Sequence, residues 1–279
     1  VIEGRASSVV NRQKLSVQLH AYGEGRSLLL SRDITALSQA DAMRRDFVAN
    51  VSHEIRTPLT VLSGFVETLQ SIPLDAQATQ HYLQLMSAQS DRMQSLVADL
   101  LMLSQLEGSQ LPSTQDKVSL AALMLQVTTE AQAFSDWMAN KGQGPVHQLE
   151  FAPVPDVYLL GARSELLSAV SNLVSNAIRY TPLGGRIQIH WSSTPEGLMF
   201  TVKDSGPGIA AEHLPRLSER FYRVDRSRSR ETGGTGLGLA ITKHVMQRHG
   251  GELRIESVLG QGSTFKLLLP YSRVLKDKP

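Results

Sequence analysis

Apolar residues recur every three or four positions over residues 48–69, and this spacing constrains the fold more than any other feature. The stripe consists of Val48, Val51, Ile55, Leu59, Leu62, Val66 and Leu69. Such a repeat predicts a helix with coiled-coil spacing, here over residues 34–71. A second helix is predicted over residues 76–107, where Tyr82, Met86, Gln89, Met93, Leu96, Leu100 and Leu103 have the same alternation.

The segment 71–75 contains Pro73 and breaks the helical pattern, so the two helices are predicted to form an antiparallel hairpin. A single pair of amphipathic helices buries its stripes poorly, whereas two copies form a four-helix bundle. The sequence therefore predicts a homodimer. The alternative is a hairpin that packs on the C-terminal part of its own chain.

His53 is predicted to point outward from the first helix. With Val48 and Ile55 at a positions and Val51 at d, His53 takes an f position. The neighbouring Glu54 can accept a hydrogen bond from the imidazole Nδ1–H, which leaves Nε2 as a nucleophile. Thr57 lies one turn further along the same face, and Pro58 is expected to kink the helix. Alone, these residues are equally compatible with an ordinary exposed helix face.

Residues 172–181 form a second candidate site, at the end of a helix with an apolar stripe. Asn172 and Asn176 are four residues apart on one face, and an amide oxygen is a suitable ligand for Mg²⁺. Arg179 could meet a phosphate. The alternative is that these asparagines only cap the end of the helix, since Thr181 and Pro182 terminate it.

Two glycine segments follow. Asp204, at the end of a predicted strand, can accept the amino hydrogen of adenine, while Gly206 and Gly208 allow close approach of the backbone. Residues 233–239 are rich in glycine and run into a helix, so they present N–H donors and a positive helix end to phosphate. Each segment alone is also typical of a turn or a flexible loop.

The order of these segments together resembles a sensor histidine kinase. The His53 segment resembles the phospho-acceptor box, residues 172–181 the N box, and the other two segments the glycine boxes. Residues 217–223 stand where the phenylalanine box belongs, with Ser218 in place of its usual phenylalanine. Within the family, residues 214–244 look most like the phosphate-regulon branch. The resemblance covers residues 31–270.

The resemblance implies ATP as substrate and Mg²⁺ as cofactor. It implies catalytic roles for His53, Glu54 and Thr57, and a metal ligand in Asn176. The implied nucleotide-binding residues are Asn172, Asn176, Arg179, Tyr180, Asp204, Gly206, Gly208, Ile209, Phe221, Thr235, Gly236, Leu237, Gly238, Leu239 and Thr264. Five arginines between residues 220 and 230 suggest a mobile lid with cationic partners for phosphate.

The implied activity is ATP-dependent phosphorylation of His53 and transfer of the phosphoryl group to an aspartate of a response regulator receiver domain. A phosphatase activity on that regulator, with Thr57 holding the water, and a role in phosphate-starvation signalling are also implied. The alternatives are an ATPase of the gyrase or chaperone type and a non-catalytic dimeric scaffold. The ATPase has no reason to display His53 and Glu54 on a dimer helix, and a scaffold would tolerate the loss of Asn176 or Asp204, yet both are present.

The fold class is predicted as α+β, with the helical hairpin followed by a two-layer α/β sandwich of the histidine kinase and gyrase type. We expect the end of a PAS sensor domain at 1–33, the hairpin at 34–107, a linker at 108–117, the ATP-binding domain at 118–272 and a tail at 273–279. The first region should be a β-hairpin formed by residues 14–22 and 27–31, with an apolar face that is poorly covered or paired with a neighbouring chain.

Composition narrows the environment. A net charge of +2 gives no reason to expect direct binding to nucleic acid. The chain has no cysteine, which fits a reducing compartment, and no stretch of roughly 20 apolar residues that could cross a bilayer. Because sensors of this family normally carry a membrane anchor, the chain is predicted to be the cytoplasmic fragment of a protein anchored in the bacterial inner membrane.

Overall fold

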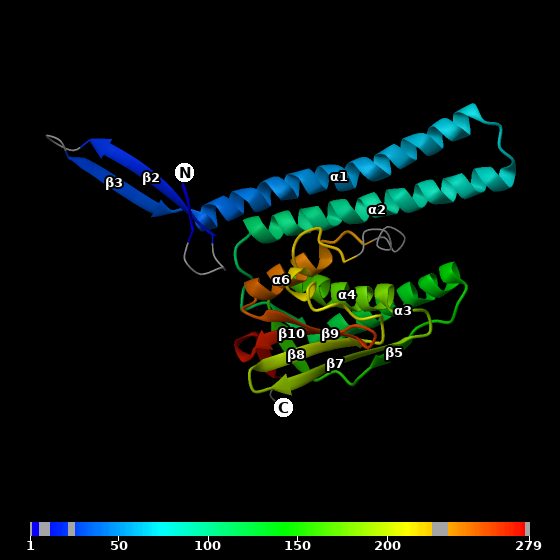
Figure 1. The fold of residues 1–279 in the computed structure, drawn as a ribbon. Helices are drawn as coiled ribbons and strands as arrows, with labels where there is room; N and C mark the ends of the chain where they lie inside the picture. Colours follow the sequence, from blue (N-terminus) through cyan, green and yellow to red (C-terminus); the bar gives the residue numbers. More distant parts are fainter. Residues whose placement is uncertain (1, 6–11, 22–25, 225–233, 277–279) are drawn as a thin grey trace. The chain divides into compact units, whose positions relative to one another are not determined.

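The structure is a computed structural model that describes residues 2–5, 12–21, 26–224 and 234–276. The chain divides into two units, residues 1–89 and 90–279. The second long helix crosses the boundary between them, so its first part belongs to one unit and its second part to the other (Figure 1).

The first unit begins with a three-stranded antiparallel sheet in the order β1-β2-β3. Its strands are β1 (Ile2–Arg5), β2 (Arg12–Ala21) and β3 (Ser27–Asp33). The predicted hairpin is therefore present, with β1 as an additional strand; residues 22–25 lie outside the described residues. Leu19 and Leu29 are 68% and 61% exposed, in agreement with the expectation of a poorly covered apolar face.

The two long helices are α1 (Thr35–Ser71) and α2 (Ala76–Gly108), as the apolar spacing predicts. Ile72, which precedes Pro73, adopts extended backbone angles and ends α1, because proline disfavours the helical conformation in the residue before it. Asp75 accepts a hydrogen bond from the backbone N–H of Ala78 and so caps α2. α1 continues through Pro58 without ending there.

The second unit contains a five-stranded sheet in the order β5-β7-β8-β10-β9. All neighbouring strands are antiparallel except β5 and β7. The strands are β5 (Gln148–Phe151), β7 (Arg186–Thr194), β8 (Gly197–Asp204), β9 (Glu252–Val258) and β10 (Gly262–Pro270). A smaller sheet has the order β11-β6-β4 and consists of β4 (Lys117–Ser119), β6 (Val157–Leu160) and β11 (Val274–Lys276).

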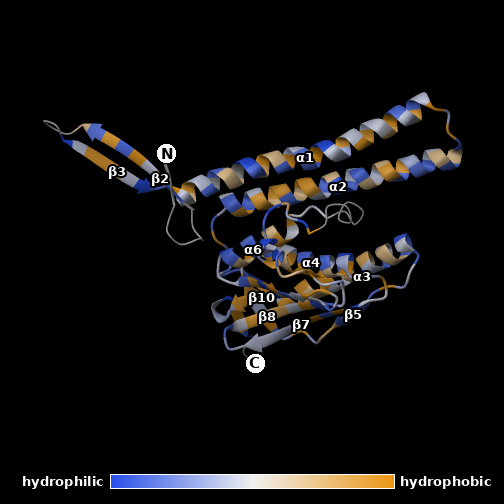
Figure 2. Ribbon diagram, viewed as in Figure 1, coloured by the Kyte–Doolittle hydropathy of each residue, from blue (hydrophilic) through white to orange (hydrophobic). Residues whose placement is uncertain are grey.

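Three helices lie along one side of the larger sheet: α3 (Leu120–Gly142), α4 (Arg163–Tyr180) and α6 (Gly238–Arg248) (Figure 1). Hydrophobic residues colour β8 and β10 and parts of these helices (Figure 2). Between them lies the core, in which Leu123, Leu173, Phe200, Val202 and Val245 are inaccessible to solvent. Burial of this apolar surface holds the helical layer on the sheet.

The result is the α+β architecture that the sequence predicts, a helical hairpin followed by an α/β sandwich. Two details differ from the sequence analysis. Residues 274–276, assigned there to a tail, pair with β6 as strand β11. Residue 117, assigned to the linker, begins strand β4. Within the described residues, the helices lack the combination of length and apolar character that spanning a membrane requires.

Candidate functional site

His53 lies in α1 and is exposed. The hydroxyl of Thr57 donates a hydrogen bond of 3.1 Å to the backbone carbonyl of His53, so the two residues lie one helical turn apart on the same side. The imidazole ring itself has no hydrogen-bond partner among the described residues. The orienting role of the half-buried Glu54 therefore stays a prediction.

Apolar residues on the hairpin are also exposed within a single chain. Val48 is 58% exposed, Leu59 47% and Val66 39%. These are members of the stripe that the sequence assigns to a coiled-coil seam. Near the turn of the hairpin, the two helices contact each other through the rings of Phe65 and Tyr82, whose centroids are 5.5 Å apart.

Asp204 ends β8 and is buried. Its Oδ1 accepts hydrogen bonds from the backbone N–H groups of Gly206 (2.8 Å) and Ser263 (3.3 Å). Burial raises the pKa of this carboxyl above its ordinary value, and the two backbone donors oppose that shift. Oδ2 has no hydrogen-bond partner in the described part of the chain, so it can accept a hydrogen bond from a ligand.

The strand register separates Ser263 from Thr264. Ser263 pairs with Asp204, whereas Thr264 pairs with the exposed Lys203. Because side chains alternate along a strand, Thr264 projects from the opposite face to Asp204. The structure thus brings Ser263, which the sequence analysis missed, to the site in place of Thr264.

The segment after Asp204 is held close to neighbouring backbone. A Cβ on Gly206 would lie 3.1 Å from the carbonyl oxygen of Tyr180. Gly208 has φ +68°, and a Cβ there would lie 2.0 Å from the carbonyl oxygen of Val258. Ile209 donates its backbone N–H to Ser257 Oγ over 2.8 Å. Only glycine fits at Gly208 without displacement of β9.

The residues predicted from the asparagine helix lie on α4 and have different roles. Asn172 donates from its side-chain amide to the carbonyl of Gly238 (3.3 Å), so it joins α4 to the start of α6. Asn176 is half-buried and its side chain makes no hydrogen bond to other described residues. The pKa of Arg179 is lowered, chiefly by burial. Arg179 and Tyr180 both approach Gly234, with Tyr180 Oη 3.4 Å from the position of a Cβ there.

The glycine-rich loop before α6 folds against the phenylalanine segment. Gly236 has φ +74° and accepts a hydrogen bond from the backbone N–H of Phe221. Phe221 itself has φ +63°, an uncommon conformation for a residue with a side chain. Leu237 is fully buried and donates its N–H to Thr235 Oγ1, while Gly238 and Leu239 begin α6. Arg226, Arg228 and Arg230 lie outside the described residues.

Asp99 of α2 is a residue that the sequence analysis missed. Its Oδ2 accepts a hydrogen bond of 2.5 Å from the hydroxyl of Thr235. The link joins residues 136 positions apart, so no local pattern in the sequence could reveal it.

Apart from Thr264, the predicted nucleotide residues thus lie around the C-terminal end of α4, the end of β8 and the start of α6. A buried carboxylate with one unused oxygen lies beside glycine backbone at Gly206. A helix N-terminus at Gly238 and the cation of Arg179 border the same loop. These features combine an acceptor for a base with donors and positive charge for phosphates.

Comparisons with known proteins agree with this geometry. The family of histidine kinase-, DNA gyrase B- and HSP90-like ATPases matches residues 161–273, and the histidine kinase A phospho-acceptor domain matches residues 43–109. The phosphate regulon sensor protein PhoR of Pseudomonas aeruginosa is 46% identical over 93% of this chain. The sensor histidine kinase WalK of Bacillus subtilis is 32% identical over 99% of it. The chain spans 57% of the length of that PhoR and 45% of that WalK.

Solved structures show the same fold. Full-length ShkA in complex with AMPPNP is 27% identical, with a TM-score of 0.57 over 84% of this chain and 47% of that one. The histidine kinase ThkA in complex with the response regulator protein TrrA, at 20% identity, has a TM-score of 0.61 over 92% of this chain and 79% of that one. Both domain families are matched in order, and sensor kinases are similar to this chain over 93% and 99% of its length. The chain therefore belongs to the sensor histidine kinase family.

Proposed function

We propose that this protein phosphorylates His53 with ATP and passes the phosphoryl group to an aspartate of a response regulator. The observation that carries the proposal is the presence, in one chain, of an exposed histidine in a matched phospho-acceptor domain and of a matched ATPase domain in which the buried Asp204 keeps one oxygen without a partner among the described residues. An ATPase of the gyrase or chaperone type has no use for an exposed histidine in a phospho-acceptor domain.

In this proposal, Asp204 Oδ2 accepts the amino hydrogen of adenine. The raised pKa of the Asp204 carboxyl indicates a poorly solvated group, and such a group gains most from a ligand donor. The backbone of residues 236–239 and Arg179 face the phosphates, where N–H donors and a cation are favourable. Tyr180, Gly208, Ile209 and Phe221 shape the walls of the site.

Asn176 fits the role of metal ligand. Its amide oxygen is a hard donor on a half-buried helix face, and it is not engaged by other described residues. Mg²⁺ usually binds through one or two protein oxygens together with substrate phosphates. Bound there, the ion would neutralise charge on the phosphate chain.

The transfer step requires the lone pair of His53 Nε2 to form a bond with the γ-phosphorus while the bond from phosphorus to the bridging oxygen of ADP breaks. Glu54 is proposed to accept a hydrogen bond from Nδ1–H and so stabilise the positive charge that develops on the ring. Positioning and charge neutralisation supply most of the catalysis in such a reaction. A carboxylate of the receiver domain then attacks the phosphohistidine and releases the neutral imidazole.

Five further elements belong to the same proposal. The exposed seam residues of α1 support a homodimer that buries them in a four-helix bundle. The similarity to PhoR supports phosphate-starvation signalling, with Thr57 positioned beside His53 for a phosphatase activity. The region boundaries, with a sensor-domain end at residues 1–33, and a membrane anchor in the full protein remain predictions.

Incubation with γ-labelled Mg·ATP tests the central claim. We expect acid-labile, base-stable label on the protein and none on a His53→Gln variant that binds ATP equally well. The other exposed histidine of the hairpin, His81, provides the matched control, and His81→Gln should label normally. Release of free phosphate without labelled protein would instead identify an ATPase of the gyrase or chaperone type.

A further inference from the structure

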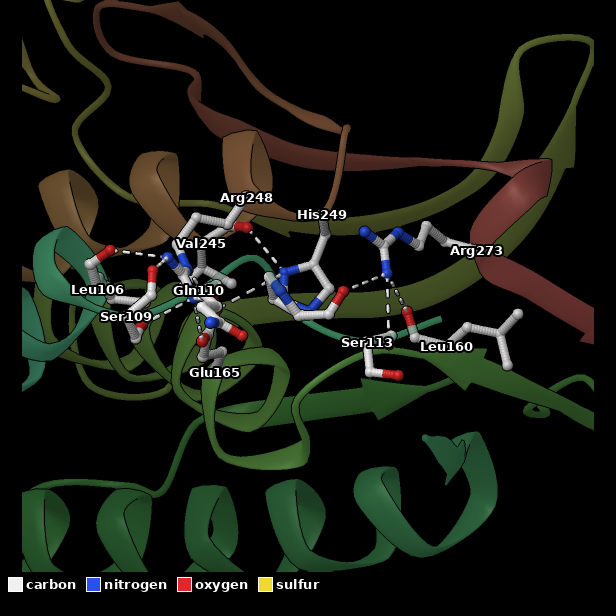
Figure 3. Close-up of polar contacts among 11 residues, drawn as sticks. Leu106, Ser109, Gln110, Ser113, Leu160, Glu165, Val245, Arg248, His249 and Arg273 are labelled. Atoms are coloured by element: carbon white, nitrogen blue, oxygen red, sulfur yellow. Dashed lines mark hydrogen bonds and ion pairs between the residues drawn. The ribbon is translucent and has the colours of Figure 1, made fainter. Parts of the chain in front are cut away.

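The ends of three helices meet at Arg248 (Figure 3). Arg248 is the last residue of α6, Glu165 lies in the first turn of α4, and Leu106 lies in the last turn of α2. Arg248 is 8% exposed and Glu165 9%, so this ion pair is buried. A buried charged pair is costly to form and persists only where its geometry satisfies both groups.

The guanidinium group of Arg248 uses all of its nitrogens. Nε and Nη2 donate to the two carboxylate oxygens of Glu165 at 3.0 and 3.1 Å, a bidentate arrangement. Nη1 donates to the carbonyls of Leu106 and Ser109 at 2.8 and 3.0 Å. Nη2 also donates to Ser109 Oγ and to the carbonyl of Gln110. Half of these six hydrogen bonds therefore go to backbone carbonyls at and just beyond the end of α2.

The charges match the helix ends that they contact. α2 has no basic residue in its own last turn, and its final carbonyls carry partial negative charge. Arg248 supplies the missing cation from 142 residues further along the chain. Glu165 lies at the positive N-terminal end of α4. Each charge thus stabilises a helix end as well as its partner.

The linker is held further along by a second arginine. Arg273 Nη1 donates to the carbonyls of Pro112 (3.1 Å) and Ser113 (3.4 Å), and also to that of Leu160 (3.3 Å) (Figure 3). The segment predicted as a linker is therefore bound to the sandwich at residues 109–110 and again at residues 112–113. Arg248 differs from Arg273 in that it also donates a hydrogen bond to α2 itself, at the carbonyl of Leu106.

We propose that Arg248 is a positioning residue for phosphorylation of His53, because it makes the end of α2 and the nucleotide-binding helix α4 one continuous unit. This inference rests on the proposed autokinase function. α2 is the second helix of the His53 hairpin, and α4 carries Asn176. Without the contacts of Arg248, a longer flexible segment connects α2 to the sandwich. The effective concentration of bound ATP near His53 then falls.

The test uses the whole chain and a paired substitution. Arg248→Met together with Glu165→Met removes both buried charges at similar volume, which avoids an unpaired carboxylate. We expect an unchanged dissociation constant for Mg·ATP, within about twofold, and a fall of about tenfold or more in the rate of His53 labelling at saturating ATP. Arg248→Lys, which keeps a charge for Glu165 but has only three donors, should give an intermediate rate. Arg254→Met removes a partly exposed arginine of the sandwich and should change neither quantity.

A labelling rate within twofold of the wild type would overturn the proposal. So would a fall in rate matched by an equal loss of ATP affinity, since that pattern identifies a purely structural residue. If the double variant does not fold, Arg248→Lys decides by the same two measurements. Failure of the wild type to label His53 would instead refute the autokinase function, and that result is read before any variant is compared.

Discussion

The carboxylate of Asp99 in α2 accepts a hydrogen bond from the hydroxyl of Thr235 in the glycine-rich loop, over 2.5 Å. Arg179 also interacts electrostatically with Asp99. A residue of the helical hairpin thus contacts the loop that is proposed to bind phosphates. Two consequences follow, one for stability and one for nucleotide affinity.

Asp99→Asn should stabilise the protein at neutral pH. Burial raises the pKa of Asp99 above its ordinary value of 3.8, so the folded state disfavours the charged form. Stability from this group is therefore complete below pH 3.8 and is lost as the pH rises through the folded-state pKa. We expect a higher melting temperature for the variant at pH 7 and convergence with the wild type near pH 4. The exposed Asp91 offers a control, since Asp91→Asn should show no such convergence.

The same substitution should tighten ATP binding. A carboxylate beside Thr235 repels the triphosphate, and the amide removes that charge while keeping an acceptor for the hydroxyl. Calorimetry with Mg·ATP should show a severalfold lower dissociation constant for Asp99→Asn. Equal affinities for the two proteins would argue against phosphates at this loop.

Asp204→Asn should abolish most of the ATP affinity. The change preserves the shape of the side chain but replaces one carboxylate oxygen with an amide NH2 group. Two hydrogen-bond donors, this NH2 and the amino group of adenine, then face each other. Loss of a hydrogen bond to a charged group corresponds to roughly a tenfold or larger increase in the dissociation constant. Circular dichroism and thermal unfolding would verify that the variant folds. An unaltered affinity would remove Asp204 from the site.

Gly208→Ala and Gly260→Ala form a matched pair for backbone strain. Both glycines have positive φ, at +68° and +81°, but a Cβ at Gly260 meets open space whereas one at Gly208 meets the carbonyl of Val258. We expect Gly260→Ala to lower the free energy of unfolding by about 1–2 kcal/mol through backbone strain alone. Gly208→Ala adds overpacking and should cost about 3 kcal/mol or more. Denaturant titration distinguishes these values, and equal losses would contradict the close approach at β9.

Glutamate at both Leu59 and Val66 should convert the proposed dimer into a monomer. These residues are exposed in a single chain, and burial of four carboxylates in a four-helix bundle is unfavourable. Light scattering after gel filtration would report the molecular mass. Gln70→Glu adds charge at an exposed polar position of the same helix and should leave the mass unchanged. A wild-type protein that is already monomeric would rule out the dimer.

The two long helices could be predicted to within a residue or two at each end, because their limits depend on local features. Apolar spacing sets their length, and Pro73 and Asp75 define the break between them. The three-residue strands β4 and β11 were not predicted, since such short strands show no alternation and exist only through pairing with β6. The sequence pattern therefore predicts elements whose limits depend on neighbouring residues, and it does not predict strands that depend on pairing with a distant segment.

The candidate site was predicted in outline and less well in its details. Glycine and asparagine motifs identified the correct segments, but one residue of strand register decides between Ser263 and Thr264. Asp99 and Arg248 carried no signal at all. Their partners lie more than 80 residues away in sequence, so packing alone determines them.

The reliance of α2 on Arg248 has a consequence for biosynthesis. The acceptors at Leu106, Ser109 and Gln110 leave the ribosome 138–142 residues before the arginine that satisfies them. During that interval water must solvate these carbonyls, so we expect the last turn of α2 to fray until α6 has been made. Domains that emerge early generally fold before those that follow. The hairpin departs from this rule at one end, because its last turn is completed only by α6, almost the last helix to be translated.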